Sequence, residues 1–218
     1  MNREDVIEHY RENQEEIESR LQEFEDLREA SDRRLFQELS FVIFSSQSSA
    51  ENAWNSAEEI GEEGLLEYSE DRIADILYEN EVQFEESKAS YITENRDNLS
   101  QPTLTDPTRS LKLRNKINPD DLEGSRKWIA ENIKGLSWKG ASHFLRNIGY
   151  GNSFAILSQH TVTVLSELDV IKAVDPPKNK KQYMEIEEKV QKFSREIEID
   201  IQALDLVLWS MKTGEIFK

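Results

Sequence analysis

The segment from Ile133 to Asn147, IKGLSWKGASHFLRN, places the strongest constraint on the fold of this chain. A helical apolar pattern ends at Ile133, and Gly135 then allows a sharp reversal of the backbone because glycine has no Cβ atom. After the reversal, apolar side chains recur at helical spacing, at Ala141, Phe144, Leu145 and Ile148. The pattern predicts two helices joined by a tight hairpin, with Leu136 filling the space between them.

Lys139 falls in the first turn of the second predicted helix. The partial positive charge at the N-terminal end of a helix disfavours an ammonium group, so we expect the pKa of Lys139 to be lowered. A lysine that is neutral part of the time is a nucleophile that can attack a sugar carbon and form a Schiff base. The alternative interpretation is an ordinary surface lysine on a helix.

This segment resembles the helix-hairpin-helix motif of DNA glycosylases with lyase activity. It is most similar to the motif of the archaeal-type 8-oxoguanine DNA glycosylase/AP lyase family, and the agreement over residues 141–147 is long and specific. Other stretches also agree with that family: residues 35–41, 46–48, 155–157, 183–187, 204–206 and 209–218. The resemblance therefore covers about residues 30 to 218.

The resemblance implies an all-α, two-lobed helix-hairpin-helix glycosylase fold. One lobe is expected to be a helical barrel of residues 32–150, with the helix-hairpin-helix at about residues 122–148. The second helical lobe is expected to combine residues 1–31 with residues 151–218.

The resemblance also implies roles for individual residues. Lys139 matches the nucleophile, and the resemblance places a group of residues in the base pocket: Trp209, Lys218 through its terminal carboxylate, Phe84 and Gln47. It places a second group at a DNA phosphate: Lys134, Gly135, Ser137 and Arg146. The residues alone leave alternatives open. Phe84 and Trp209 could equally be core residues, and the polar cluster that contains Gln47 could serve simply as the cap of the next helix.

Two positions depart from the family pattern. Ser137 replaces the second glycine of the hairpin, and Ser158 occupies the position of the catalytic aspartate. Serine and aspartate are both good N-cap residues, so Ser158 keeps the structural role of the aspartate at the start of a helix while removing its charge. We interpret His143 and His160, which also match family positions, as structural.

Composition excludes several classes of site. The chain has no cysteine, which excludes disulfides, thiolate metal sites and iron–sulfur clusters, and its three histidines are isolated. We therefore expect no metal and no cofactor. No apolar run reaches membrane length and the first residues do not form a signal peptide, so we expect no membrane partner and a cytoplasmic, nucleoid-associated monomer.

The net charge of −17 opposes DNA binding, because phosphate contacts need Lys and Arg. The charge is uneven, however: residues 1–100 hold 28 acidic and 9 basic side chains, whereas residues 101–218 hold 16 and 18. The hairpin lies in the second part, where basic side chains form a local patch: Arg126, Lys127, Lys134, Lys139 and Arg146.

Further helices are predicted along the rest of the chain. Periodicity indicates one charged helix over residues 3–30, and a buried central helix that begins near Arg33 and is capped by Ser31 or Asp32. It also indicates helices over residues 50–60, 70–79 and 88–99, with a break at Gly61 and Gly64, and a loop over residues 100–107.

Together these features predict a DNA repair glycosylase with AP lyase activity. Its partner would be double-stranded DNA with a damaged base or an abasic site, and it would excise 8-oxoguanine through a Schiff base on Lys139. Excision would be altered or reduced because of Ser158. Two alternatives remain: a non-catalytic relative that binds a lesion or modified base, and a glycosylase retuned to another base with Asp205 or a glutamate as its carboxylate.

Overall fold

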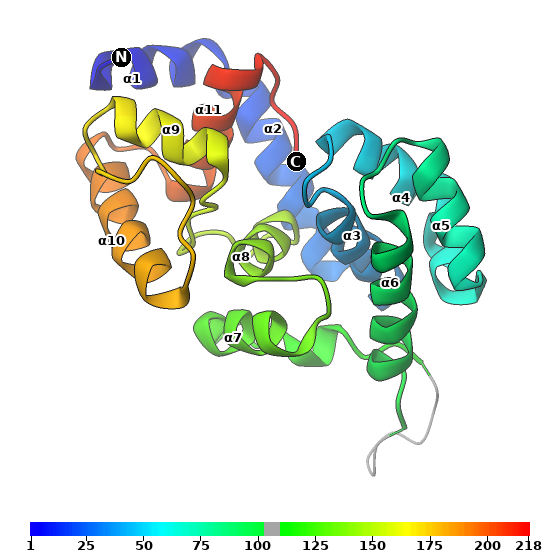
Figure 1. Cartoon of the computed structure of the whole chain (residues 1–218). Helices are drawn as coiled ribbons and strands as arrows, with labels where there is room; N and C mark the ends of the chain where they lie inside the picture. The colour runs from blue at the N-terminus through cyan, green and yellow to red at the C-terminus, as the bar shows by residue number, and fades with distance from the viewer. Residues whose placement is uncertain (103–109) are drawn as a thin grey trace. The chain divides into compact units, whose positions relative to one another are not determined.

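The computed structural model describes residues 1–102 and 110–218. All regular structure in these residues is helical, in eleven α-helices and two short 3₁₀ segments (Figure 1). The prediction of an all-α fold is therefore confirmed. Among the described residues, no helix is both long enough and apolar enough to cross a membrane.

The chain forms two compact units. The terminal unit contains residues 1–28 and 145–218, and the middle unit contains residues 29–144. From the sequence, the two boundaries were expected after residues 31 and 150, a few residues later than the boundaries in the structure. The loop expected over residues 100–107 falls mostly outside the described residues.

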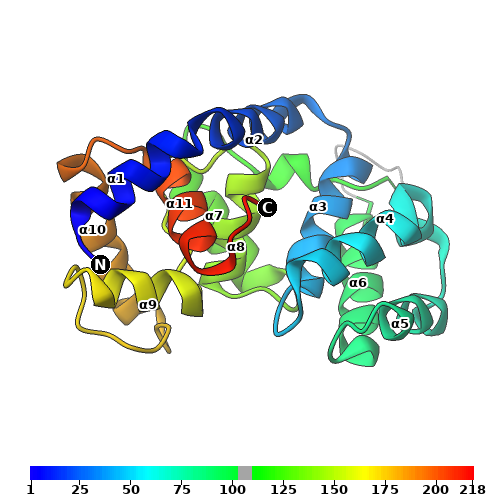
Figure 2. The ribbon, with the colours of Figure 1, turned by 90° about the horizontal axis from the view of Figure 1, so that it is seen from above.

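The middle unit is built on α3, which is buried along most of its length, as predicted. Every residue from Leu35 to Phe44 is buried, and the Ser31 hydroxyl caps the helix by accepting from the Arg34 amide. Helices α3 to α6 pack together as one group (Figure 2). The helices of this unit are α3 (Asp32–Phe44), α4 (Ala50–Glu67), α5 (Glu70–Glu79), α6 (Glu85–Leu99), α7 (Leu122–Asn132) and most of α8 (Trp138–Asn147).

The boundaries of α4 and α6 differ from the prediction. Helix α4 bends at Gly61, where φ is +68°, and then continues to Glu67 instead of ending at the glycine. Glycine tolerates this backbone conformation, so the chain changes direction and re-enters the helix. Helix α6 begins three residues earlier than expected, directly after Phe84.

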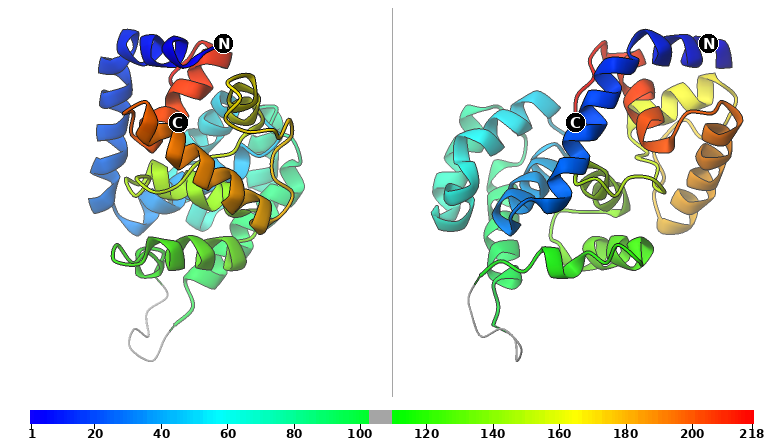
Figure 3. Two further views of the ribbon diagram at one scale, coloured as in Figure 1. Left: turned by 90° about the vertical axis from the view of Figure 1, so that its left-hand side faces the viewer. Right: turned by 180° about the vertical axis from the view of Figure 1, so that it is seen from behind.

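The first helix of the terminal unit was predicted as one element over residues 3–30, and this prediction was wrong. The structure has α1 (Arg3–Glu12) and α2 (Gln14–Asp26), separated by Asn13. The Asn13 side-chain amide donates to the His9 carbonyl oxygen at 2.8 Å, and such local bonds compete with helix continuation. Figure 3 shows that the two helices run in different directions.

Helix α11 forms the centre of the terminal unit. It is buried on nearly every side and packs against α1, α2, α9 and α10. The other two helices of this unit are α9 (Gln159–Glu167) and α10 (Lys180–Glu196), and α11 covers Ile201–Thr213 (Figure 3).

Candidate active site

The predicted hairpin is present between α7 and α8. Its turn is closed by a hydrogen bond from the Leu136 amide to the Ile133 carbonyl at 3.3 Å, and Gly135 has φ +83°. Helix α8 then starts with the Ala141 amide donating to the Ser137 carbonyl at 2.8 Å. A Cβ atom on Gly140 would lie 2.8 Å from the Leu136 side chain, so Leu136 packs against α8 as expected.

Asn95 on α6 holds the backbone of this hairpin. Its side-chain amide donates to the Lys134 carbonyl at 3.0 Å, and its carbonyl oxygen accepts from the Lys134 amide at 2.9 Å. Because Asn95 is fully buried, water does not compete for these bonds. This role of Asn95 was not predicted from the sequence.

Gly135 fits closely against the helices behind the hairpin. A Cβ atom at this position would lie 2.7 Å from the Tyr91 ring and 3.2 Å from the Ile43 side chain. The residue also has a positive φ, which L side chains rarely adopt. Both the backbone conformation and the packing therefore require glycine here.

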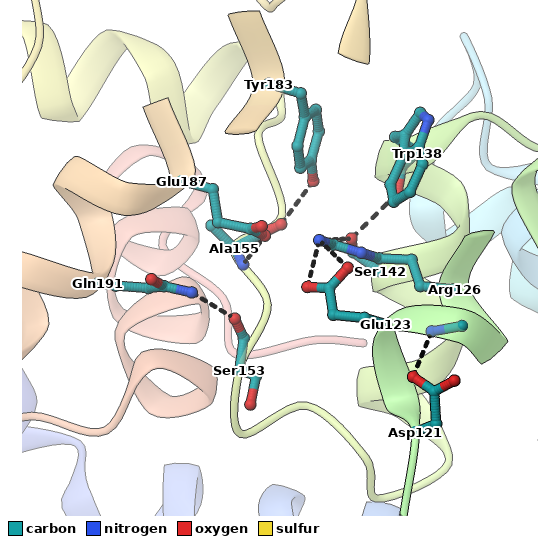
Figure 4. A network of polar contacts seen from close by, with 11 residues as sticks. Asp121, Glu123, Arg126, Trp138, Ser142, Ser153, Ala155, Tyr183, Glu187 and Gln191 are labelled. Carbon is teal, nitrogen blue, oxygen red and sulfur yellow. Dashed lines mark hydrogen bonds and ion pairs between the residues drawn. The ribbon is translucent and has the colours of Figure 1, made fainter. Parts of the chain in front are cut away.

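Arg126 joins the two helices of the motif, although from the sequence it was expected to belong to a local basic patch. Its side chain is buried and donates to both carboxylate oxygens of Glu123, at 2.7 and 2.9 Å, and to the Ser142 hydroxyl at 3.2 Å (Figure 4). The guanidinium also lies 4.9 Å from the centre of the Trp138 ring. Arg126 therefore links α7 to α8, and its buried side chain does not contribute to a basic surface.

Lys139 is the second residue of α8, which confirms its predicted place in the first turn. Its side chain is half-buried. Lys134, in the hairpin itself, is exposed and lies 3.5 Å from the Glu94 carboxylate. An exposed ion pair of this kind is worth little, so Lys134 can exchange Glu94 for another anion.

A pocket of about 310 Å³ lies beside the hairpin in the middle unit. It is lined by Ile43, Ser46, Gln47, Phe84, Ser87, Lys88, Tyr91 and Gly135. The structure thus brings two residues of the expected base pocket, Gln47 and Phe84, together with the hairpin glycine. Phe84 is 56% exposed, so the alternative of an ordinary core residue was wrong.

Lys88 lines this pocket, and its role was not predicted from the sequence. Its ammonium donates to the carbonyl oxygens of Phe44 and Ser46, at 2.8 and 2.7 Å, and to the Ser48 hydroxyl at 3.1 Å. Burial lowers the pKa of Lys88 to about 8, although the negative charge of Glu85 partly raises it. The one sequence signal was register, since Lys88 and Asn95 share a helix face with Ile92 and Leu99.

In the terminal unit, Ser158 caps α9 as predicted. Its hydroxyl accepts from the Thr161 amide at 3.1 Å. The segment before it is held by α10, where the Tyr183 hydroxyl donates to the Ala155 carbonyl at 2.5 Å and the Ala155 amide donates to Glu187 at 2.9 Å (Figure 4). These two contacts fix the backbone that leads into Ser158.

Trp209 on α11 is half-buried, and the ring of His160 meets it edge-on at a centroid distance of 4.9 Å. His160 therefore packs against an expected base-pocket residue. The second histidine, His143, makes a similar edge contact with Phe41 at 5.8 Å. Lys218 is half-buried.

Arg146 lies differently from the expectation. Only 2% of its surface is exposed, and its guanidinium lies 3.5 Å from the Asp205 carboxylate and 4.7 Å from the centre of the Phe24 ring. This position argues against the phosphate contact expected for Arg146. Arg146 also pairs with Asp205, so Asp205 is poorly placed to act as the carboxylate of a glycosylase retuned to another base.

The residues described here contain no group of three or more His, Asp or Glu side chains that could hold a metal ion.

A family model described as 8-oxoguanine DNA glycosylase matches residues 17–199, which is most of the chain. The chain belongs to the 8-oxoguanine DNA glycosylase family. The resemblance inferred from the hairpin segment is thus confirmed.

Relatives within the 8-oxoguanine DNA glycosylase family are similar over nearly their whole length. The 8-oxoguanine DNA glycosylase/AP lyase of Fusobacterium nucleatum is 35% identical over 210 residues, covering 96% of this chain and 94% of that protein. The enzyme of the same name from Korarchaeum cryptofilum is 34% identical over 202 residues, covering 93% and 90%.

Solved structures of 8-oxoguanine DNA glycosylases share the fold. The Thermotoga maritima enzyme gives a TM-score of 0.86 at 29% identity, covering 99% of this chain and 98% of the other. The Methanocaldococcus jannaschii glycosylase/lyase, crystallised with a 15mer DNA containing 8-oxoguanine, gives a TM-score of 0.81 at 26% identity, covering 98% and 99%.

The close fit of Gly135 leads to a first prediction. Gly135→Ala should lower the free energy of unfolding by about 2–4 kcal/mol, since the backbone strain of roughly 1–2 kcal/mol adds to the overlap with Tyr91. The measurement is urea unfolding followed by circular dichroism. The matched control is Gly214→Ala, which has φ +82° but no atom within 4 Å of the added Cβ. Equal losses of unfolding free energy in both variants would show that the close packing of Gly135 against Tyr91 is unimportant.

The lowered pKa of Lys88 leads to a second prediction. Because the unfolded chain keeps the ordinary pKa of 10.5, it binds more protons than the folded protein between pH 8 and pH 10.5. The free energy of unfolding of the wild type, relative to that of Lys88→Met, should therefore rise as the pH increases through this interval, by at most about 3 kcal/mol. Below pH 8 the difference between the two proteins should not change with pH. Urea unfolding of both proteins between pH 7 and pH 10 measures the difference. A constant difference would show that the ammonium is not destabilised by burial.

Proposed function

We propose that this protein is a DNA glycosylase with AP lyase activity that removes 8-oxoguanine from double-stranded DNA through a Schiff base on Lys139. One observation carries the proposal: Lys139 stands in the first turn of α8, directly after a hairpin whose shape depends on Gly135. Membership of the 8-oxoguanine DNA glycosylase family supports the choice of substrate.

The hairpin is proposed to hold the DNA by one phosphate. Backbone N–H groups at a helix N-terminus bind phosphate oxygens, and the candidates here are those of Gly135 and Ser137, with the exposed ammonium of Lys134 beside them. Such contacts do not depend on base sequence. This suits an enzyme that searches DNA for damage, and we expect it to act as a monomer.

The chemistry requires the target nucleotide to rotate out of the duplex. The neutral amine of Lys139 then attacks C1′ of the deoxyribose, and the bond from C1′ to the base breaks. The sugar ring opens to give a Schiff base between Lys139 and C1′. Loss of a proton from C2′ expels the 3′ phosphate oxygen by β-elimination, which cleaves the strand.

Four residues are proposed to recognise the base. The rings of Phe84 and Trp209 offer faces for stacking, which is worth roughly 1–3 kcal/mol per base, while Gln47 and Lys218 offer hydrogen-bonding groups. The exposure of Phe84 and Gln47 in the pocket of the middle unit supports their part in this assignment.

Ser158 is proposed to weaken base excision. The resemblance places an aspartate there, whose charge stabilises the positive charge that develops on the sugar and helps to deprotonate the lysine. Removing one preorganised electrostatic group typically costs about 3 kcal/mol, or roughly a hundredfold or more in rate. Schiff-base formation at an existing abasic site does not require a base to leave, so the lyase reaction should persist.

Ser158 also favours a second candidate function, a relative that binds the lesion without excising it. The third possibility, a glycosylase retuned to another base, loses one of its proposed carboxylates because Asp205 is paired with Arg146. Tight binding of lesion DNA without turnover would identify the second candidate, and excision of a different base would identify the third.

The nucleophile is tested by borohydride trapping on duplexes that contain 8-oxoguanine or an abasic site. The wild-type protein should form a covalent adduct with the abasic duplex, and Lys139→Gln should form none because the attacking amine is gone. Lys189→Gln, an exposed lysine on α10, is the control and should trap normally. Equal trapping by Lys139→Gln would disprove the assignment.

The missing carboxylate is tested by Ser158→Asp. Since aspartate is also a good N-cap, α9 should keep its start while 8-oxoguanine excision under single-turnover conditions rises roughly a hundredfold. Ser158→Ala serves as the control, because it removes the cap without adding charge and should lose about 0.5–2 kcal/mol of stability with no gain in excision. If Ser158→Asp brings no gain, Ser158 does not limit excision.

A further inference from the structure

Two residues that line the pocket of the middle unit have unusual backbone conformations. Gln47 has φ +58° and Phe84 has φ +60°, a region that non-glycine residues rarely adopt and that is unfavourable for a bulky side chain. Both side chains are exposed. Strained backbone persists where the surrounding structure holds it, so the contacts that hold these two residues are informative.

One buried ammonium connects the segments that carry them. Lys88 donates to the carbonyl oxygens of Phe44 and Ser46 and to the Ser48 hydroxyl, on both sides of Gln47. The Ser48 hydroxyl also accepts from the Gln83 amide at 2.8 Å, directly before Phe84. Lys88 and Ser48 therefore link the loop between α3 and α4 to the turn before α6.

The number of donors matches the number of acceptors. An ammonium has three N–H groups, and the three partners of Lys88 lie between 2.7 and 3.1 Å from its nitrogen. A side chain without these donors would leave two carbonyl groups of the α3 end without the bonds they make here, and the loop would have to move to satisfy them.

We propose that Lys88 is a positioning residue for base recognition, whose ammonium and its Ser48 link hold Gln47 and Phe84 in place to contact a nucleobase in this pocket. The inference rests on the proposed function and deepens it. Lys88 does not touch the base itself, because its three N–H groups are used within the protein. Phe84 supplies an aromatic face for stacking, and Gln47 supplies an amide for hydrogen bonds to a base edge.

A purely structural role for Lys88 makes a different prediction. If Lys88 only stabilised the fold, its loss would lower stability but would affect DNA with and without the base equally. If it positions the base contacts, its loss changes the preference between the two. The ratio of two binding constants therefore separates the interpretations.

The experiment measures the dissociation constants of two duplexes of the same sequence, one with 8-oxoguanine and one with a tetrahydrofuran abasic analogue. Lys88→Met should reduce the preference for the base-containing duplex about tenfold, the effect expected for one lost stacking contact. Ser48→Ala should reduce it less, because only the link to Gln83 is removed.

Lys112→Met is the matched control. Lys112 is a buried lysine of the same unit, 6% exposed against 4% for Lys88, and it donates to the Gln101 carbonyl at 3.1 Å without lining the pocket. This variant should keep the wild-type preference. Should Lys88→Met fail to fold, the result for Ser48→Ala decides.

Wild-type preference in both Lys88→Met and Ser48→Ala would overturn the proposal, as would an equal loss of preference in Lys112→Met. Both dissociation constants are measured in the Lys139→Gln background, where the proposed nucleophile is absent, so each describes a binding equilibrium. Failure of the proposed enzymatic function would instead show as an absence of trapping by the wild-type protein.

Discussion

The pair of hydrogen bonds between the Asn95 side chain and the backbone of Lys134 fixes the hairpin to α6. A turn between two helices has few backbone partners of its own, and here a buried amide supplies both a donor and an acceptor. Gly135 then fits against Tyr91 on the same helix. The position of the start of α8, and with it the backbone of Lys139, depends on these contacts with α6.

Helix α6 supports two loops with one face. Asn95 holds the hairpin, and Lys88, two turns earlier, holds the loop between α3 and α4. Both are polar residues on a face that is otherwise apolar, and both use their hydrogen bonds on backbone groups of distant segments. The pocket between these loops is therefore bordered by segments that are fastened to the same helix.

Sequence was informative where structure depends on local patterns. The hairpin, the buried α3, the Ser158 cap and the place of Lys139 all follow from glycine, capping and periodicity rules that act within a few residues. The roles of Lys88, Asn95 and Arg126 did not follow, because each has partners that lie far away in the chain: 44 residues for Lys88 and Phe44, 39 for Asn95 and Lys134, and 16 for Arg126 and Ser142. Burial of a charged residue reflects such distant partners, which is also why the pairing of Arg146 with Asp205 was not predicted.

The cap at the start of α9 has a consequence for how this protein can evolve. Serine and aspartate both satisfy the first amides of a helix, so either residue is compatible with the same backbone. Selection for a stable fold therefore exerts little pressure on the choice between them. A negative charge can therefore be gained or lost at residue 158 while the start of α9 stays unchanged.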